Sequence, residues 1–166
     1  MKNVAFATVI VALTCFPVEV GMAFPLGILL CNPGALRHTH DHWHGQTRLQ
    51  TDKRFVRFDS PVMGERALMK VLHTYFKDHD LYTVSGIIYR WAPPTENNTE
   101  LYVSDIARRM GVKSNDYLDL GNIDTLIKLA KAITTHENGF PPDNLPATWY
   151  TEAVYHEAAM MVLNGE

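Results

Sequence analysis

Apolar residues recur three and four positions apart over much of the chain after residue 60, which is the spacing of one face of an α-helix. Ser60 and Pro61 provide an N-cap followed by proline at the first helical position, so we expect a helix over 61–79. Its apolar stripe consists of Ala67, Leu68, Val71, Leu72, Tyr75 and Phe76. A shorter helix is expected over 83–91, and Pro93-Pro94 accounts for its end.

Three further helices follow from the same pattern. One starts near Asn98 and ends at Gly111, and the next is capped by Asn122 and ends before Gly139. A last helix is expected over about 148–163. The apolar positions of the three are Leu101, Tyr102, Ile106, Ala107 and Met110, then Leu126, Ile127, Ala130 and Ile133, then Ala153, Val154, Ala158, Met161 and Val162.

The stretch 36–59 is polar and has the only strand character in the chain, with a hairpin expected to end in Phe55-Val56-Arg57-Phe58. The fold class is therefore α+β, predominantly α-helical, with a small β subdomain.

The N-terminal segment resembles a secretory signal peptide. It begins with Lys2, is apolar from Val4 to Phe16, and has Gly21-Met22-Ala23 before an expected cut at Phe24. A retained membrane anchor and a lipoprotein cut before Cys15 are the alternatives, although Pro17, Glu19 and Gly21 interrupt an apolar span. We expect residues 1–23 to be removed and 24–166 to form a single domain in a secreted or periplasmic protein.

Composition narrows the function classes. The 166 residues carry 15 Lys and Arg against 18 Asp and Glu, a formal charge of −3, so nothing provides the basic field that a nucleic-acid-binding protein needs. No Gly-rich phosphate loop, GxSxG elbow or HExxH motif occurs, and no cofactor is expected. The alternate histidines of His38-Thr39-His40-Asp41-His42-Trp43-His44 would point in parallel on a strand, so we predict a solvated loop and not a metal site.

Glu137 is the first catalytic candidate. It lies in Thr135-His136-Glu137-Asn138-Gly139, where an amphipathic helix ends. A partly buried carboxylate at the negative end of a helix dipole is expected to have a raised pKa, which suits a general acid, whereas a solvated helix-end glutamate has no such role. Glu96 lies in a loop rich in capping residues, and Tyr102 lies among apolar helix positions, so either could face a site or serve the fold alone.

Five ordered blocks over residues 27–140 resemble a family of phage and prophage proteins that are described as virion structural proteins. The blocks are Asn32 to Arg37, Trp43 with Gly45, Phe55 to Leu68, Thr83 to Tyr102, and His136 to Gly139. Cys31, Ala35, Glu65 and the histidine-rich insertion depart from the family pattern.

The chain also resembles the lytic transglycosylases of the lysozyme superfamily. A turn at Asn32-Pro33-Gly34, a helix with Gly64 to Leu68 and a late block at Glu96 to Val103 match elements of that family. Its helix-end glutamate comes last and not first, which implies a circular permutation of a lysozyme-like fold.

These resemblances imply a phage- or prophage-related enzyme that cleaves the β-1,4 bond between N-acetylmuramic acid and N-acetylglucosamine in peptidoglycan glycan strands, acting as a transglycosylase or a muramidase. Glu137 would be catalytic, with Glu96 and Tyr102 assisting it. The implied substrate-binding residues are Asn32, Gly34, Arg37, Trp43, Trp91, Asn97 and Asn138. The alternative is a non-enzymatic virion or wall-binding protein on the same scaffold. Virion association is compatible with both, and the sequence leaves the oligomeric state open.

Overall fold

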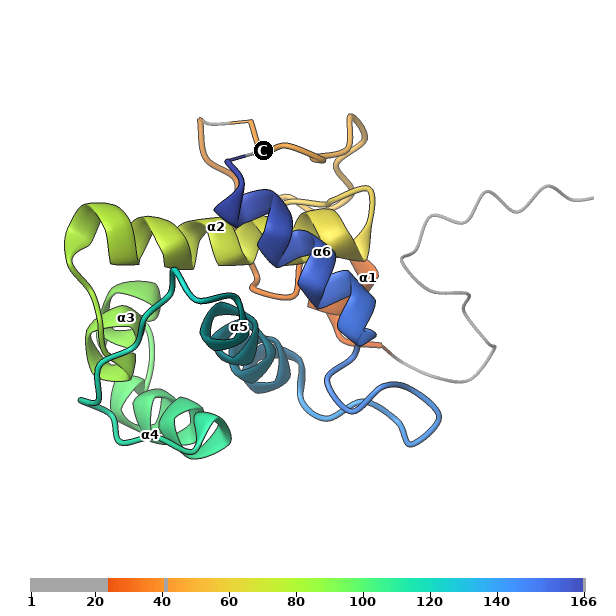
Figure 1. Cartoon of the computed structure of the whole chain (residues 1–166). Coiled ribbons are helices and arrows are strands. Elements are labelled where there is room, and N and C mark those ends of the chain that lie inside the picture. Colours follow the sequence, from red (N-terminus) through yellow and green to blue (C-terminus); the bar gives the residue numbers. More distant parts are fainter. Residues whose placement is uncertain (1–23, 41, 166) are drawn as a thin grey trace, which may run out of the picture.

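The computed structural model describes residues 24–40 and 42–165, and this part of the chain is predominantly helical (Figure 1). Its helices are α1 (Leu26–Leu29), α2 (Pro61–His79), α3 (Val84–Trp91), α4 (Thr99–Met110), α5 (Ile123–Asn138) and α6 (Glu152–Leu163). None of these is both long and apolar enough to cross a membrane. The expected signal peptide or anchor, residues 1–23, lies outside the described residues.

Side-chain caps set the helix boundaries where the sequence predicts them. The Ser60 hydroxyl accepts a hydrogen bond from the backbone N–H of Met63 and begins α2, so the helix predicted over 61–79 is confirmed. Asn98 caps α4 and Asn122 caps α5 in the same way. Gly111, at φ 67°, ends α4 in the left-handed conformation that glycine adopts without strain.

Two helix predictions need correction. The last helix begins at Glu152 and not near 148, because the proline-rich stretch before it forms a loop in which Trp149 has a φ of 74°. With that start, Tyr155 faces the core and Ala153 is exposed. In α4, Leu101 is 66% exposed although it shares the helical spacing of its buried neighbours.

The predicted β subdomain takes a different form. Within 24–40 and 42–165 there is no strand, only two isolated antiparallel bridges, Arg37 with Phe55 and Gln46 with Phe58. The Gln50 side chain supplements these bridges: it accepts a hydrogen bond from the N–H of Arg57 at 2.7 Å and donates one to its carbonyl at 3.1 Å. Scattered backbone bonds, such as that from the N–H of Val56 to the carbonyl of Leu36 at 2.9 Å, satisfy other groups of the segment without a continuous ladder.

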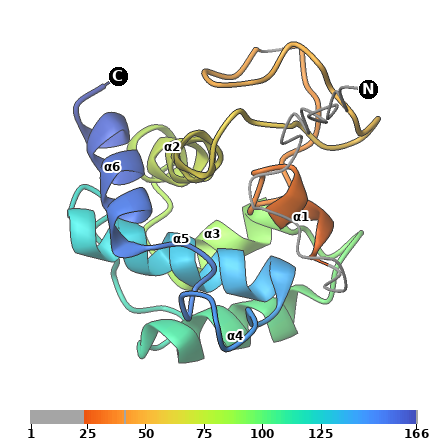
Figure 2. The ribbon, with the colours of Figure 1, turned by 90° about the vertical axis from the view of Figure 1, so that its right-hand side faces the viewer.

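Helix α5 is the central element and contacts α1, α2, α4 and α6. On one side of it α2 and α6 pack across each other, and on the other side lie α3 and α4 (Figures 1 and 2). A single large core joins these helices and includes Leu72, Ile106, Leu126 and Tyr155. The irregular 30–59 segment packs through a small second cluster that contains Val56 and Phe58. The C-terminal end of α5 lies beside α1, where Gly27 approaches Asn138 at one edge of the core.

Among the residues that the structure describes, one carboxyl group is fully buried in the core, that of Glu65 on α2. Its Oε1 accepts a hydrogen bond from the Thr134 hydroxyl at 2.8 Å, and Oε2 has no hydrogen-bond partner among the described residues. Burial raises the pKa of Glu65 to about 8, although the Thr134 bond and the charge of Lys131 act in the opposite direction. Glu65 is therefore protonated at neutral pH.

Replacing Glu65 with glutamine should flatten the pH dependence of stability. The folded wild-type chain keeps a proton that the unfolded chain releases at its ordinary pKa of 4.5, so its free energy of unfolding should fall as pH rises from 4.5 through about 8. The fall should be on the order of 5 kcal/mol, because one pKa unit corresponds to about 1.4 kcal/mol. Urea unfolding at a series of pH values measures it, and equal slopes in both proteins would show that Glu65 is ionised in the core.

Candidate functional site

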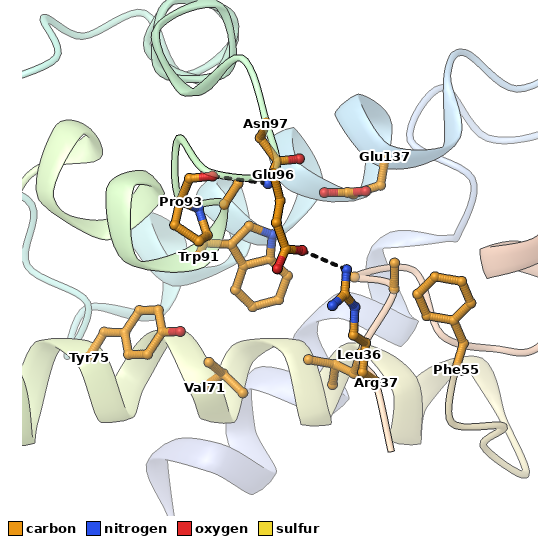
Figure 3. A pocket seen from close by; sticks show the side chains of 13 residues that line it. Leu36, Arg37, Phe55, Val71, Tyr75, Trp91, Pro93, Glu96, Asn97 and Glu137 are labelled. Atoms are coloured by element: carbon orange, nitrogen blue, oxygen red, sulfur yellow. Dashed lines mark hydrogen bonds and ion pairs between the residues drawn. The ribbon is translucent and has the colours of Figure 1, made fainter. Parts of the chain in front are cut away.

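A cleft of about 430 Å³ lies beside the C-terminal end of α5 (Figure 3). Four segments distant in sequence form it: the 34–37 turn with Phe55, one face of α2, the end of α3 with the loop 92–97, and Glu137 at the end of α5. Aromatic surface comes from Phe55, Tyr75 and Trp91, and charge comes from Arg37, Glu96 and Glu137. Apolar rings beside a few charged groups are typical of a ligand site.

Two asparagines fix the turn that forms one wall of the cleft. The Asn32 side chain binds both backbone groups of Leu36 at 2.9 Å and the carbonyl of Val56 at 2.8 Å. Asn138, at the end of α5, donates to the carbonyl of Pro33 at 2.8 Å. Both side chains are buried, and their hydrogen bonds to the backbone position the wall of the cleft. A direct role of Asn32 or Asn138 in substrate binding stays a prediction.

Glu137 is exposed, and among the described residues one hydrogen bond holds its carboxyl group. The hydroxyl of Tyr102, on α4, donates to its Oε1 at 2.6 Å. Burial and the charge of Glu137 raise the pKa of Tyr102 above its ordinary range, while a contact with Trp91 acts in the opposite direction, so the hydroxyl stays a donor. No hydrogen bond to Oε2 is found within 24–40 and 42–165, which leaves this oxygen open.

A second layer of contacts holds Tyr102 itself. The ring of His136 stacks on the Tyr102 ring with centroids 3.6 Å apart. His136 Nδ1 lies 2.7 Å from Asp105 Oδ2, which also accepts a hydrogen bond from Arg109 Nε at 2.7 Å. Partial burial would raise the pKa of Asp105, but the bonds from Arg109 and His136 outweigh it and lower this pKa to about 2. Asp105 is therefore a permanent anion that orients His136 against Tyr102.

Arg37 and Glu96 form an ion pair at the mouth of the cleft, drawn as a dashed line in Figure 3. Their nitrogen and oxygen atoms lie 2.8 Å apart, and 67% and 55% of the two side chains are exposed. An exposed pair of this kind is worth about 1 kcal/mol or less, so an occupant of the cleft could break it at small cost. Glu96 is thus the second carboxylate of the cleft and is engaged by a cation.

A side hollow of about 240 Å³ adjoins the cleft and shares Ala35, Phe55 and Glu137 with it. Its remaining wall comes from residues 25–27 and 30 around α1, with Asn32 and Asn138. Glu137 therefore stands where two hollows meet, and an elongated ligand could extend to both sides of its carboxyl group.

The structure brings most of the predicted site residues together. Six of them line the cleft: Gly34, Arg37, Trp91, Glu96, Asn97 and Glu137. Tyr102 lies beneath Glu137, and the two asparagines line the side hollow. Trp43 lies elsewhere, half-buried against the second cluster, because the 36–59 segment folds back on the start of α2. Sequence reasoning missed Phe55 and the Asp105–His136 pair, and it placed Tyr75 in the core although this ring also lines the cleft.

The histidine-rich run forms no metal site among the described residues, in which no group of three ligating side chains gathers. His38 uses Nε2 to contact the carbonyl of Asp52 at 3.1 Å, while His40, His42 and His44 are exposed. Asp41 lies outside the described residues.

The sequence of the chain was compared with those of known proteins. No protein-family model matches the chain. The chain is 35% identical over 130 residues to Protein P5 of Pseudoalteromonas phage PM2, and the match covers 76% of this chain and 79% of the phage protein. A match of this extent includes most of the described helices. The expected relation to phage proteins is thereby confirmed, whereas the likeness to lytic transglycosylases stays a prediction.

Proposed function

The chain belongs to the family of Protein P5 of Pseudoalteromonas phage PM2, and from this premise we propose that it is a phage or prophage enzyme that cleaves the glycan strands of peptidoglycan. The bond cleaved is the β-1,4 link between N-acetylmuramic acid and N-acetylglucosamine. The observation that carries the proposal is the placement of Glu137: one carboxyl oxygen is fixed by Tyr102, the other is open, and the group stands between two hollows.

In this proposal Glu137 protonates the glycosidic oxygen through Oε2 as the bond breaks. The same carboxylate then takes a proton either from water, which gives a reducing end, or from the 6-hydroxyl of the sugar, which gives an anhydro product. The second course needs no other free carboxylate. It therefore suits a cleft whose other acid, Glu96, is paired with Arg37.

The remaining residues of the cleft would bind and orient the sugars. The ring of Trp91 is half-buried and faces the cleft, where it can stack on a sugar face. Asn97 and Arg37 supply hydrogen-bond donors at the mouth. Tyr102 is a positioning residue, because its hydroxyl is already used to hold Glu137.

Replacing Tyr102 with phenylalanine should lower the turnover number about tenfold to a hundredfold with little change in KM, since Glu137 would lose the bond that orients its carboxyl group. Initial rates on soluble glycan fragments measure this. Tyr89→Phe is a matched control, because the Tyr89 hydroxyl also binds a glutamate, Glu100, but on the exposed surface away from the cleft. Equal losses in the two variants would remove the assigned role of Tyr102.

A non-enzymatic role in wall binding is the second candidate. It is favoured by the exposure of Glu137, since a general acid is usually shielded from water, and by the ion pair that crosses the mouth of the cleft. The same aromatic and polar residues would then bind a glycan without cleaving it.

The test incubates the purified protein with isolated peptidoglycan over several pH values and measures the soluble fragments released. Release above that of a heat-unfolded sample is the result expected of an enzyme. Binding to the polymer by well-folded protein without any release would favour the second candidate. We further propose that the protein acts outside the cytoplasm, in the periplasm or as part of a virion, where it would meet this substrate.

A further inference from the structure

A third hollow, of about 270 Å³, lies on the side of α5 opposite the cleft. Lys128, Lys131, Ala132 and Thr135 follow the helical spacing i, i+3, i+4 and i+7 and form its floor. Arg109 from the end of α4 and Phe140 from the loop after α5 border it. We call this site the basic hollow; it shares no lining residue with the cleft or the side hollow.

The charge of the basic hollow is positive. Three cations line it and no acidic residue does. Arg109 uses only Nε for Asp105, so its two terminal nitrogens have no partner among the described residues, and the exposed Lys128 has no ion pair there. Lys131 is paired with Glu152, whose side chain is 81% exposed. The groups available in the basic hollow thus complement an anion.

Phe140 adds an aromatic surface to these cations. Phe140 is 74% exposed, the largest exposed fraction among the large apolar residues of the described chain, and the Arg109 guanidinium lies 4.9 Å from its ring centroid. A further depression of about 390 Å³ shares Phe140 and Ala147 with the basic hollow, and its wall also contains Pro141, Pro142, Asp143 and Leu145. An exposed ring that is fixed by a cation contact presents a flat surface suited to stacking against a sugar ring.

We propose that the basic hollow and Phe140 form an anchoring site for a peptidoglycan strand, separate from the cleft. The cations would bind the carboxylates of the peptide stems, and Phe140 would stack on a neighbouring sugar. The identity of the polymer rests on the proposed function, but the charge and the exposed ring do not. The site keeps the protein on the polymer between encounters of the cleft with a bond.

The test measures sedimentation of the full-length protein with isolated peptidoglycan, in the Glu137→Gln background so that the polymer stays intact. Lys128→Glu and Phe140→Ala should each weaken apparent affinity about tenfold, and higher salt should weaken the binding of the parent protein. The controls are Lys70→Glu, an exposed lysine on α2, and Leu101→Ala, an exposed apolar residue on α4. Insoluble chitin, a neutral glycan, should bind more weakly than peptidoglycan and without the effect of Lys128→Glu.

Affinities that match the controls, or equal effects of Lys128→Glu on chitin, would overturn the anchoring site. The proposed enzymatic function is judged separately, by fragment release in the otherwise wild-type chain. If Lys128→Glu lowers binding but no variant releases fragments, the anchor stands and the enzyme does not. If fragments are released while substitutions at Lys128 and Phe140 leave binding unchanged, the enzyme stands and the anchoring site does not.

Discussion

Replacing Glu137 with glutamine should reduce release of fragments from peptidoglycan about a thousandfold or more. General acid–base catalysis is worth about a hundredfold to ten-thousandfold, and here one carboxyl group would serve as both acid and base. Glutamine keeps the shape of the side chain and can still accept the hydrogen bond from Tyr102 through its amide oxygen. The loss should therefore come from the missing proton and not from a disturbed cleft. The decrease in turbidity of a peptidoglycan suspension measures it.

The melting temperature of Glu137→Gln should equal that of the parent protein, since Glu137 is exposed. Retained activity in a folded variant would move the acid to Glu96, the other carboxyl group of the cleft. Glu65 is not an alternative acid, because it is fully buried in the core and lines neither the cleft nor the side hollow.

Replacing Gly64 with alanine should cost at least about 3 kcal/mol of stability and most of any activity. A Cβ at this position would lie 1.7 Å from the carbonyl oxygen of Cys31 and 2.8 Å from its carbonyl carbon. These are backbone atoms, so either α2 or the 31–34 turn must move. Because that turn leads directly to Gly34 and Arg37 in the cleft wall, its displacement should also disturb the site. Urea unfolding and fragment release measure the two effects.

Gly86→Ala is the matched control, because Gly86 also lies within a helix. A Cβ there would meet nothing closer than the Thr83 hydroxyl at 3.3 Å, and alanine is the better helix former. Its stability should change by less than about 1 kcal/mol. Similar losses at Gly64 and Gly86 would mean that the close approach of α2 to the turn does not govern stability.

The helices could be predicted from sequence because their signals are local. Ser60, Asn98 and Asn122 each bind a backbone N–H two or three residues ahead, and that geometry depends on nothing distant. The helical spacing likewise predicted the apolar stripe of α5, the helix whose last turn carries Glu137 at the edge of the core. Glycine and proline marked most of the ends for the same local reason.

The features that sequence did not predict, in the fold and in the site, depend on contacts between distant segments. The 36–59 segment has residues that favour strands, but scattered backbone bonds and the Gln50 side chain, which pairs with the backbone of Arg57, satisfy its polar groups without a sheet. Trp43 could not be separated from Trp91 by sequence, since only the folding of that segment places one ring in the second cluster and the other in the cleft. Nor does spacing show that Asp105 and His136, 31 positions apart, support Tyr102.

The most direct measurement identifies, by mass spectrometry, the sugar ends of fragments released from purified peptidoglycan by the wild-type protein beside Glu137→Gln. The account predicts fragments that end in anhydro or reducing amino sugars, and their loss in the variant. Anhydro ends would mean a transglycosylase, and reducing ends a hydrolase. Glycan strands left uncut by the wild-type protein, or cut equally by the variant, would contradict the assignment of Glu137 as the catalytic acid.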